Sequence, residues 1–347
     1  MILKNFFKTN TKSKITWLII LLVLVLIKVL LQTVFKSTQM AQIIDIELFA
    51  SGVRLSTPLI LAALGGLFSE RAGVVNIALD GIMIFGAFSG AVIAYETSNP
   101  WFGALGAMLI GGLIAHIHGV ASIRYQADQI VSGTAINLLA IGVPAVISNV
   151  LYNSTSVTPN IPLIIPIINI PFLADIPILG ILLGKYSVLV FVAFAMVPIS
   201  WFILFKTSFG LRLRAVGENP EAADTAGINV YLMRYYGVWM SGLLAGLGGA
   251  FLSVAHGSSY VRDISAGRGF IALAALIFGR YTPKLLFLGC LMFGIADAFQ
   301  IRVQGVIPIP TQFVQMFPYV LTMIVLAGLM GKAQVPAADG IPYVQSK

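Results

Sequence analysis

Charged residues are scarce in this sequence. Only 10% of its 347 residues are Asp, Glu, Lys or Arg, whereas an ordinary soluble domain carries about a quarter. Hydrophobic residues make up 58% of the chain, so its outer surface has to meet lipid rather than water. The composition therefore excludes an ordinary soluble domain and indicates a protein embedded in a bilayer.

Residues typical of catalytic and metal sites are also scarce. The single cysteine, Cys290, lies within an apolar run, which excludes a disulfide framework. The Gly-Lys pairs at Gly184 and Gly331 lack the spacing and the Ser or Thr of a phosphate-binding loop. No cluster of Asp, His or Lys marks a membrane enzyme, and no basic stripe with interleaved aromatics marks a nucleic-acid surface. We therefore predict no catalytic residue, no metal and no cofactor bound by this chain.

Long apolar runs, separated by polar residues or by Gly and Pro, predict an all-α membrane protein of about ten transmembrane helices. The eighth run is too short to cross a bilayer alone at 1.5 Å per residue, so we expect either a half-helix or an extension into the flanking segment Gly267–Gly269. The spans are expected near residues 15–36, 47–69, 73–95, 100–123, 127–151, 185–206, 232–255, 269–281, 284–300 and 312–331.

Residues 1–36 combine a lysine-rich leader with the first apolar run. This run is longer than the apolar core of about 7–15 residues in a signal peptide, and no small-residue cleavage site follows it. We therefore expect a retained first helix with a cytoplasmic N-terminus. Residues 37–347 are expected to form the main transmembrane domain.

The distribution of basic residues favours this arrangement. With ten spans and a cytoplasmic N-terminus, fourteen of the 21 Lys and Arg residues fall on the cytoplasmic side and seven on the outer side. Basic residues are enriched in cytoplasmic loops of membrane proteins. The count therefore predicts that both termini are cytoplasmic.

The inner connection, residues 207–230, contains a short helix with clear boundary signals. Asn219 suits the N-cap, Pro220 the first helical position, and Glu221 the positive end of the helix dipole. Gly227 suits the C-terminal end. Because its alanine-rich body has little apolar bulk to bury, this helix is expected to be offered to another protein. A solvated connector is the alternative.

Three segments carry a resemblance to a known family: RAVGENPEAADTAGI at residues 214–228, SERAGVVNIALDGIMIFGAFSG at 69–90 and AGRGFIALAALIFG at 266–279. Together they resemble the permease subunits of bacterial ABC importers for ribose-type sugars, branched-chain amino acids and nucleosides. SERAGVVNIALDG is most similar to the nucleoside-type permeases. The resemblance extends from about residue 48 to residue 331.

This resemblance implies uptake of nucleosides, with purine nucleosides favoured and ribose-type simple sugars as the alternative. It implies an ABC-importer permease fold in the bacterial cytoplasmic membrane, with two permeases enclosing one pathway. The implied partners are a cytoplasmic ATPase that carries ATP and Mg²⁺, a second and distinct homologous permease, and a substrate-binding lipoprotein.

The resemblance also implies a role for the loop helix, which corresponds to the coupling helix that docks on the ATPase. Arg214 is expected to pair with acidic groups of that ATPase. The coupling role falls on Gly217, Glu218, Asn219, Pro220, Glu221 and Ala222.

Polar residues predicted inside the membrane are candidates for the substrate pathway. Asn76 and Asp80 are expected in the first turns of the span at residues 73–95, four residues apart and so on one face. A nucleoside needs hydrogen-bonding groups and flat apolar surfaces. The alternative is helix–helix contact for the asparagines and capping for Asp80 and its neighbours. The pathway candidates are Asn76, Phe68, Phe85, Phe88 and Asn137.

An ion-coupled secondary transporter is the remaining alternative. It would require intramembrane acids, and the middles of the spans offer few besides Asp80 and Asp297. Asp297 is expected to form a structural ion pair with Arg302 or Arg280. A secondary transporter would also leave the capped loop helix unexplained.

Overall fold

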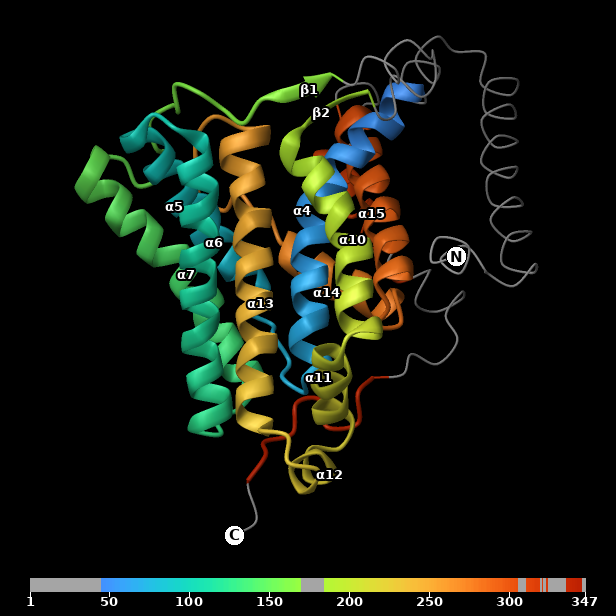
Figure 1. Cartoon of the computed structure of the whole chain (residues 1–347). Coiled ribbons are helices and arrows are strands. Elements are labelled where there is room, and N and C mark those ends of the chain that lie inside the picture. Colours follow the sequence, from blue (N-terminus) through green and yellow to red (C-terminus); the bar gives the residue numbers. More distant parts are fainter. Residues whose placement is uncertain are drawn as a thin grey trace.

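The computed structural model describes residues 45–169, 184–304, 310–318, 320, 323 and 335–344. The described residues form a helical bundle, with a short two-stranded β-sheet at one end and two short helices at the other (Figure 1). Seven helices in these ranges are long and apolar enough to cross a membrane. They are α4 (Ile46–Arg71), α5 (Leu79–Thr97), α6 (Pro100–Gly119) continued by the π-helical turn η1 (Val120–Arg124), α7 (Gln129–Tyr152), α10 (Val188–Lys206), α13 (Val230–Ala250) continued by η2 (Phe251–His256), and α15 (Pro283–Val303).

These helices match seven of the ten predicted spans, and the eighth predicted run is present as a short helix. It is α14 (Arg268–Phe278), a helix of 11 residues. The predicted first span, residues 15–36, lies outside the described residues. Most of the tenth, residues 312–331, does so too; its described part begins with α16 (Thr311–Gln315).

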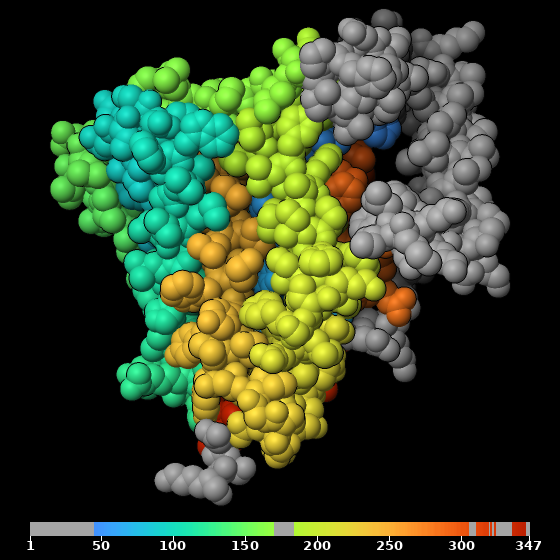
Figure 2. All heavy atoms as spheres, in the orientation of Figure 1, coloured from blue at the N-terminus to red at the C-terminus, as the bar shows by residue number. Residues whose placement is uncertain are grey.

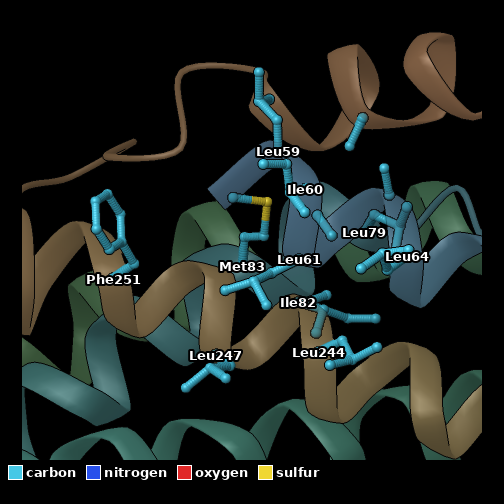
Figure 3. Packing of buried hydrophobic residues seen from close by; sticks show 14 of the residues in the cluster. Leu59, Ile60, Leu61, Leu64, Leu79, Ile82, Met83, Leu244, Leu247 and Phe251 are labelled. Carbon is cyan, nitrogen blue, oxygen red and sulfur yellow. The ribbon is translucent and has the colours of Figure 1, made fainter. Parts of the chain in front are cut away.

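Helices α4, α5 and α13 form the centre of the bundle. They are largely buried along their length, whereas only 22% of the most apolar part of α7 is buried. Figure 3 shows aliphatic side chains of the three central helices meeting in one cluster, which includes Leu61 of α4, Met83 of α5 and Leu247 of α13. The central helices therefore have their contacts within the chain, while α7 leaves much of its apolar surface open.

Close approach between helices depends on glycine in α13. A β-carbon at Gly249 would collide with the Met83 carbonyl of α5, and one at Gly246 would collide with the Ala107 carbonyl of α6. Without a hydrophobic driving force in lipid, membrane helices gain stability from such close packing of small residues. Glycine therefore sets the spacing between α13 and both of its neighbours.

The two ends of the bundle differ in structure. At one end, β1 (Ile167–Asn169) pairs antiparallel with β2 (Lys185–Ser187), with Ile168 opposite Tyr186. At the other end lie α11 (Ser208–Glu218) and α12 (Pro220–Thr225), beside the described C-terminal residues 335–344 (Figure 1). The α12 end carries the loop that the sequence singles out.

Candidate functional site

The loop between α10 and α13 contains the predicted short helix with the predicted caps. The Asn219 side chain accepts the backbone N–H of Ala222 at 3.0 Å, and Pro220 occupies the first helical position. Gly227 has a φ of +79°, which an L side chain rarely adopts. These local signals make α12 a separate helix, because its cap turns the chain sharply after α11.

Helix α12 offers one face outward and rests on the other. Glu221 and Ala222 are exposed, whereas Ala223 is buried. Ala223 packs in a small cluster with residues of α11, α13 and the C-terminal segment. In Figure 2, the yellow atoms of α11 and α12 lie at the lower end of the molecule. The outward face is therefore accessible to a partner.

The residues just before α12 connect it to the end of α4. Gly217 packs directly against the Arg71 carbonyl, where a β-carbon would collide. The Glu218 carboxylate lies 3.6 Å from the Arg71 guanidinium, which also donates to the Tyr281 carbonyl at 2.9 Å. The residues that precede α12 therefore contact the end of α4, a central helix of the bundle, so a displacement of α12 would act close to α4.

Arg214 has its partners at the end of α10. Its Nε donates to the Leu204 carbonyl at 2.9 Å, and its guanidinium lies 4.8 Å from the centre of the Phe205 ring. The side chain is half-buried. Arg214 thus joins α11 to α10, and its pairing with an ATPase stays a prediction.

The C-terminal segment, residues 335–344, is part of this end of the molecule, and sequence reasoning missed it. Ala338 donates its backbone N–H to the Gly217 carbonyl at 2.9 Å. Arg234 of α13 is almost fully buried and donates to the Ile341 carbonyl at 3.0 Å. The segment has neither helical nor strand periodicity; Tyr343 in a Pro- and Gly-containing stretch is the one signal that hints at packing.

Asn76 does not lie in a helix, which corrects the prediction that it shares a helical face with Asp80. Helix α5 begins only at Leu79, and residues 72–78 form an irregular connection from α4. The Asn76 side chain is fully buried, donates to Ser241 Oγ at 2.8 Å and accepts the Ala78 N–H at 3.1 Å. The predicted start of this helix, at residue 73, was too early because the connection is nearly as apolar as the helix.

Side chains of two helices, α6 and α7, also hold this connection. Asn137 of α7 accepts the Gly81 N–H at 2.7 Å and donates to the Ile77 carbonyl at 3.0 Å. Gln129 accepts the Val75 N–H at 2.7 Å, and a His118 ring nitrogen lies 3.0 Å from the Val75 carbonyl. Irregular backbone at membrane depth needs such partners, because lipid supplies none. The Asn137 bonds are helix–helix contacts of the kind that the alternative interpretation of the asparagines predicted.

The three candidate phenylalanines belong to the interior of the chain. Phe68 is fully buried in the central cluster, and Phe85 and Phe88 on α5 are nearly so. The Phe88 ring meets the Tyr260 ring edge-on, with centroids 5.2 Å apart. The five pathway candidates thus gather around α5, and four of them are buried within a single copy of the chain. Their assignment to a pathway stays a prediction.

Two intramembrane acids are compensated by the segment around the start of α14. Asp80 accepts the Gly269 N–H at 2.9 Å and the Ser265 hydroxyl at 3.1 Å. Asp297 pairs with Arg268 at 2.8 Å. The predicted structural ion pair of Asp297 is therefore confirmed, but its predicted partner, Arg302 or Arg280, is wrong. Arg302 instead contacts Asp45 and Glu47, at the start of α4.

The open face of α7 forms an apolar hollow of about 620 Å³. The hollow is lined by Ala135, Leu138, Leu139, Gly142, Val143, Val146 and Ile147.

Among the described residues, no group of three or more His, Cys, Asp or Glu side chains could hold a metal ion.

Several known proteins similar to this chain are named as permeases. The nucleoside ABC transporter permease protein NupC of Lactococcus lactis is 45% identical over 84% of this chain and 95% of its own length. The guanosine ABC transporter permease protein NupQ of Bacillus subtilis is 45% identical over 84% of this chain and 94% of its own length. TsgC13 of Haloferax volcanii, whose name assigns it provisionally to glucose, is 35% identical over 74% of this chain and 79% of its own length.

A solved structure of an inward-facing ABC transporter, provisionally of the metal-chelate type, is similar over 86% of this chain and 88% of its own, with 16% identity and a TM-score of 0.45. The family described as the permease component of branched-chain amino acid transport systems matches residues 48–326. The match spans α4 to the residues after α16. This chain therefore belongs to that permease family.

Proposed function

We propose that this chain is the permease subunit of an ABC importer that takes up nucleosides, with purine nucleosides favoured. The observation that carries the proposal is α12, a capped helix with an exposed outward face at one end of an apolar bundle. The names of two relatives at 45% identity, a nucleoside permease and a guanosine permease, support the cargo. The α12 end is then the cytoplasmic end, and both termini are cytoplasmic.

The proposed partners follow from this assignment. A separate ATPase binds ATP and Mg²⁺ and docks on residues 217–222, with Arg214 nearby. A second, homologous permease completes the pathway, and a substrate-binding lipoprotein delivers the nucleoside. Closure of the ATPase pair moves α12 and, through the Glu218–Arg71 contact, the end of α4. Rigid-body motion of this kind is common in transporters.

We propose that the pathway runs along the open face of α7, between the two permeases. The five predicted residues, Asn76, Phe68, Phe85, Phe88 and Asn137, then shape the pathway from behind by positioning α5 and α7. Asn137 supports this arrangement, because it extends from α7 to the backbone of α5. The apolar side chains that line the hollow on α7 provide a surface over which a base could move.

Cysteine accessibility tests the pathway, because the native Cys290 is fully buried. Leu139→Cys, on α7, is expected to react with a water-soluble maleimide in the assembled transporter, and substrate should slow the reaction. Leu109→Cys is the matched control on the exposed face of α6 and is expected to stay unreactive in lipid. Equal reactivity at both positions would contradict a pathway along α7.

Ribose-type or other simple sugars are the second candidate cargo, favoured by the relative whose name refers to glucose. Uptake of labelled guanosine into proteoliposomes that contain the purified transporter separates the two. We expect guanosine uptake that requires ATP and is competed by adenosine but not by ribose or glucose. Competition by ribose alone would favour the sugar assignment, and uptake without ATP would favour an ion-coupled transporter.

The double substitution Asn219→Pro with Glu221→Lys tests the coupling role of α12. Proline removes the cap, and lysine opposes the helix dipole. We expect membrane insertion to persist while ATP hydrolysis no longer drives uptake. Asn160→Ala, an exposed change on the segment before β1, serves as the control. Unaltered uptake by the double variant would contradict the coupling assignment.

A further inference from the structure

We propose that the C-terminal segment, residues 335–344, positions the coupling helix α12, and that Tyr343 is the residue through which it does so. This inference rests on the proposed function of α12. In the sequence, the segment begins four residues after the end of the last predicted span, yet it packs on α11, α12 and α13 rather than leaving the bundle.

Two adjacent backbone groups of the segment hold the end of α11. Ala338 donates to the Gly217 carbonyl at 2.9 Å, and Ala337 donates to the Glu218 carboxylate at 3.4 Å. Gly217 and Glu218 directly precede Asn219, the cap of α12. The segment therefore holds in place the two residues that directly precede the N-cap of α12.

Three further contacts tie the segment to α13 and α12. The Tyr231 hydroxyl donates to the Tyr343 carbonyl at 3.4 Å, and the two rings lie 5.6 Å apart. Arg234 donates to the Ile341 carbonyl at 3.0 Å. The Tyr343 hydroxyl lies beside the Asp224 carboxylate of α12. One side chain thus touches both the first turn of α13 and the coupling helix.

Helix α12 needs external support because of its length. It has six residues, and isolated helices shorter than about 12–15 residues are marginal in water. Its buried contact is made by Ala223, in a cluster with Val216, Val230, Met233 and Tyr343. Tyr343 is the largest of these five buried side chains and the one that the C-terminal segment contributes.

The neighbouring side chains provide matched controls. Tyr343 is 6% exposed, whereas Val344 is 65% exposed and lies one residue further along the same segment. If the segment acted only as a tether, replacing either side chain would have the same effect. If Tyr343 positions α12, only its replacement should alter the coupling of hydrolysis to uptake.

The test uses the complete transporter in proteoliposomes, measuring guanosine uptake and ATP hydrolysis in the same sample. We expect Tyr343→Ala to lower the number of nucleosides transported per ATP at least fivefold while hydrolysis continues. Tyr343→Phe keeps the ring but loses the hydroxyl beside Asp224, so it should lower the ratio by less than Tyr343→Ala does, and Val344→Ala should match the unmodified protein. An unchanged ratio in Tyr343→Ala would overturn the inference.

Two other outcomes of this experiment also have a defined meaning. If Tyr343→Ala fails to assemble, Tyr343→Phe decides. A lowered transport ratio with normal assembly supports positioning through the hydroxyl and Asp224, and an unchanged ratio leaves Tyr343 a packing residue and overturns the inference. If the unmodified transporter takes up no nucleoside, the proposed function fails. An unmodified transporter that works, with a Tyr343→Ala variant that works equally well, contradicts the positioning role alone.

Discussion

Asp80 accepts the backbone N–H of Gly269 at 2.9 Å, so a carboxylate on α5 satisfies the start of α14, 189 residues further along the chain. The first N–H groups of a helix have no partner within that helix, and lipid offers none. A β-carbon at Gly269 would collide with the Asp80 backbone. The short helix α14 is thus anchored at its start by another helix rather than by its own cap.

Replacing Asp80 should destabilise the protein. Asp80→Ala leaves the Gly269 N–H and the Ser265 hydroxyl without their acceptor, which costs about 1–3 kcal/mol for each buried group left unsatisfied. A lower midpoint of thermal unfolding in detergent would show this. Glu47→Ala is the control, because its side chain is 71% exposed, and it should change the midpoint little. Equal midpoints for the two variants would contradict an anchoring role.

The Arg268–Asp297 pair should depend on both partners. Removal of one partner leaves a poorly solvated charge, which costs about 3–5 kcal/mol in buried pairs. We therefore expect Asp297→Ala to destabilise more than Asp297→Ala combined with Arg268→Met, which removes both charges. Unfolding midpoints of the two single variants and the double variant would measure the coupling. Additive losses would show that the two charges act independently.

Glycine at the helix contacts should be hard to replace. Gly246→Ala places a methyl group against the Ala107 carbonyl of α6, and overpacking of this kind costs about 1–3 kcal/mol. Gly142→Ala on α7 is the matched control, because a β-carbon there meets nothing within 4 Å. Thermal unfolding should separate the two variants, and a destabilised Gly142→Ala with an unaffected Gly246→Ala would reverse the expectation.

Docking of the C-terminal segment should weaken as pH rises. Burial raises the pKa of Asp339 from 3.8 to about 7, although Arg234 of α13 and the Gly340 N–H oppose the shift. The carboxyl of Glu70 at the end of α4 also interacts with Asp339, and Tyr281 lies beside Glu70. Between the ordinary Asp339 pKa of 3.8 and the raised pKa of about 7, the Asp339 carboxyl binds a proton in the docked segment that it lacks in the released segment. Docking is therefore strongest below the ordinary pKa, and the protonated contribution is lost as pH rises through about 7.

A spin label at Val344→Cys would report this docking, since Val344 is exposed and the native Cys290 is buried. We expect the label to be more mobile at about pH 8 than at about pH 5. Asp339→Asn should remove the difference, because asparagine does not titrate. A pH response that persists in Asp339→Asn would assign the titration to another group.

Local signals determined the helices of this protein and the loop between α10 and α13. Apolar runs predicted seven long helices and the short α14, because hydropathy adds up residue by residue along the chain. Asn219, Pro220 and Gly227 predicted α12, because a helix cap is made by residues within one turn of each other. Even so, the start of α5 was misplaced, since the connection that contains Asn76 differs little from the helix in polarity.

Partners across the bundle were decided by the tertiary structure alone. Asp297 meets Arg268 rather than Arg302, and Asp80 meets Gly269, because helix packing and the depth of each residue in the bundle set these distances. The docking of Tyr343 beneath α12 had no periodic signal at all, since a segment without helix or strand has no repeating pattern. Hydropathy shows which residues enter the membrane, but only the packed helices determine which polar groups come within hydrogen-bonding distance there.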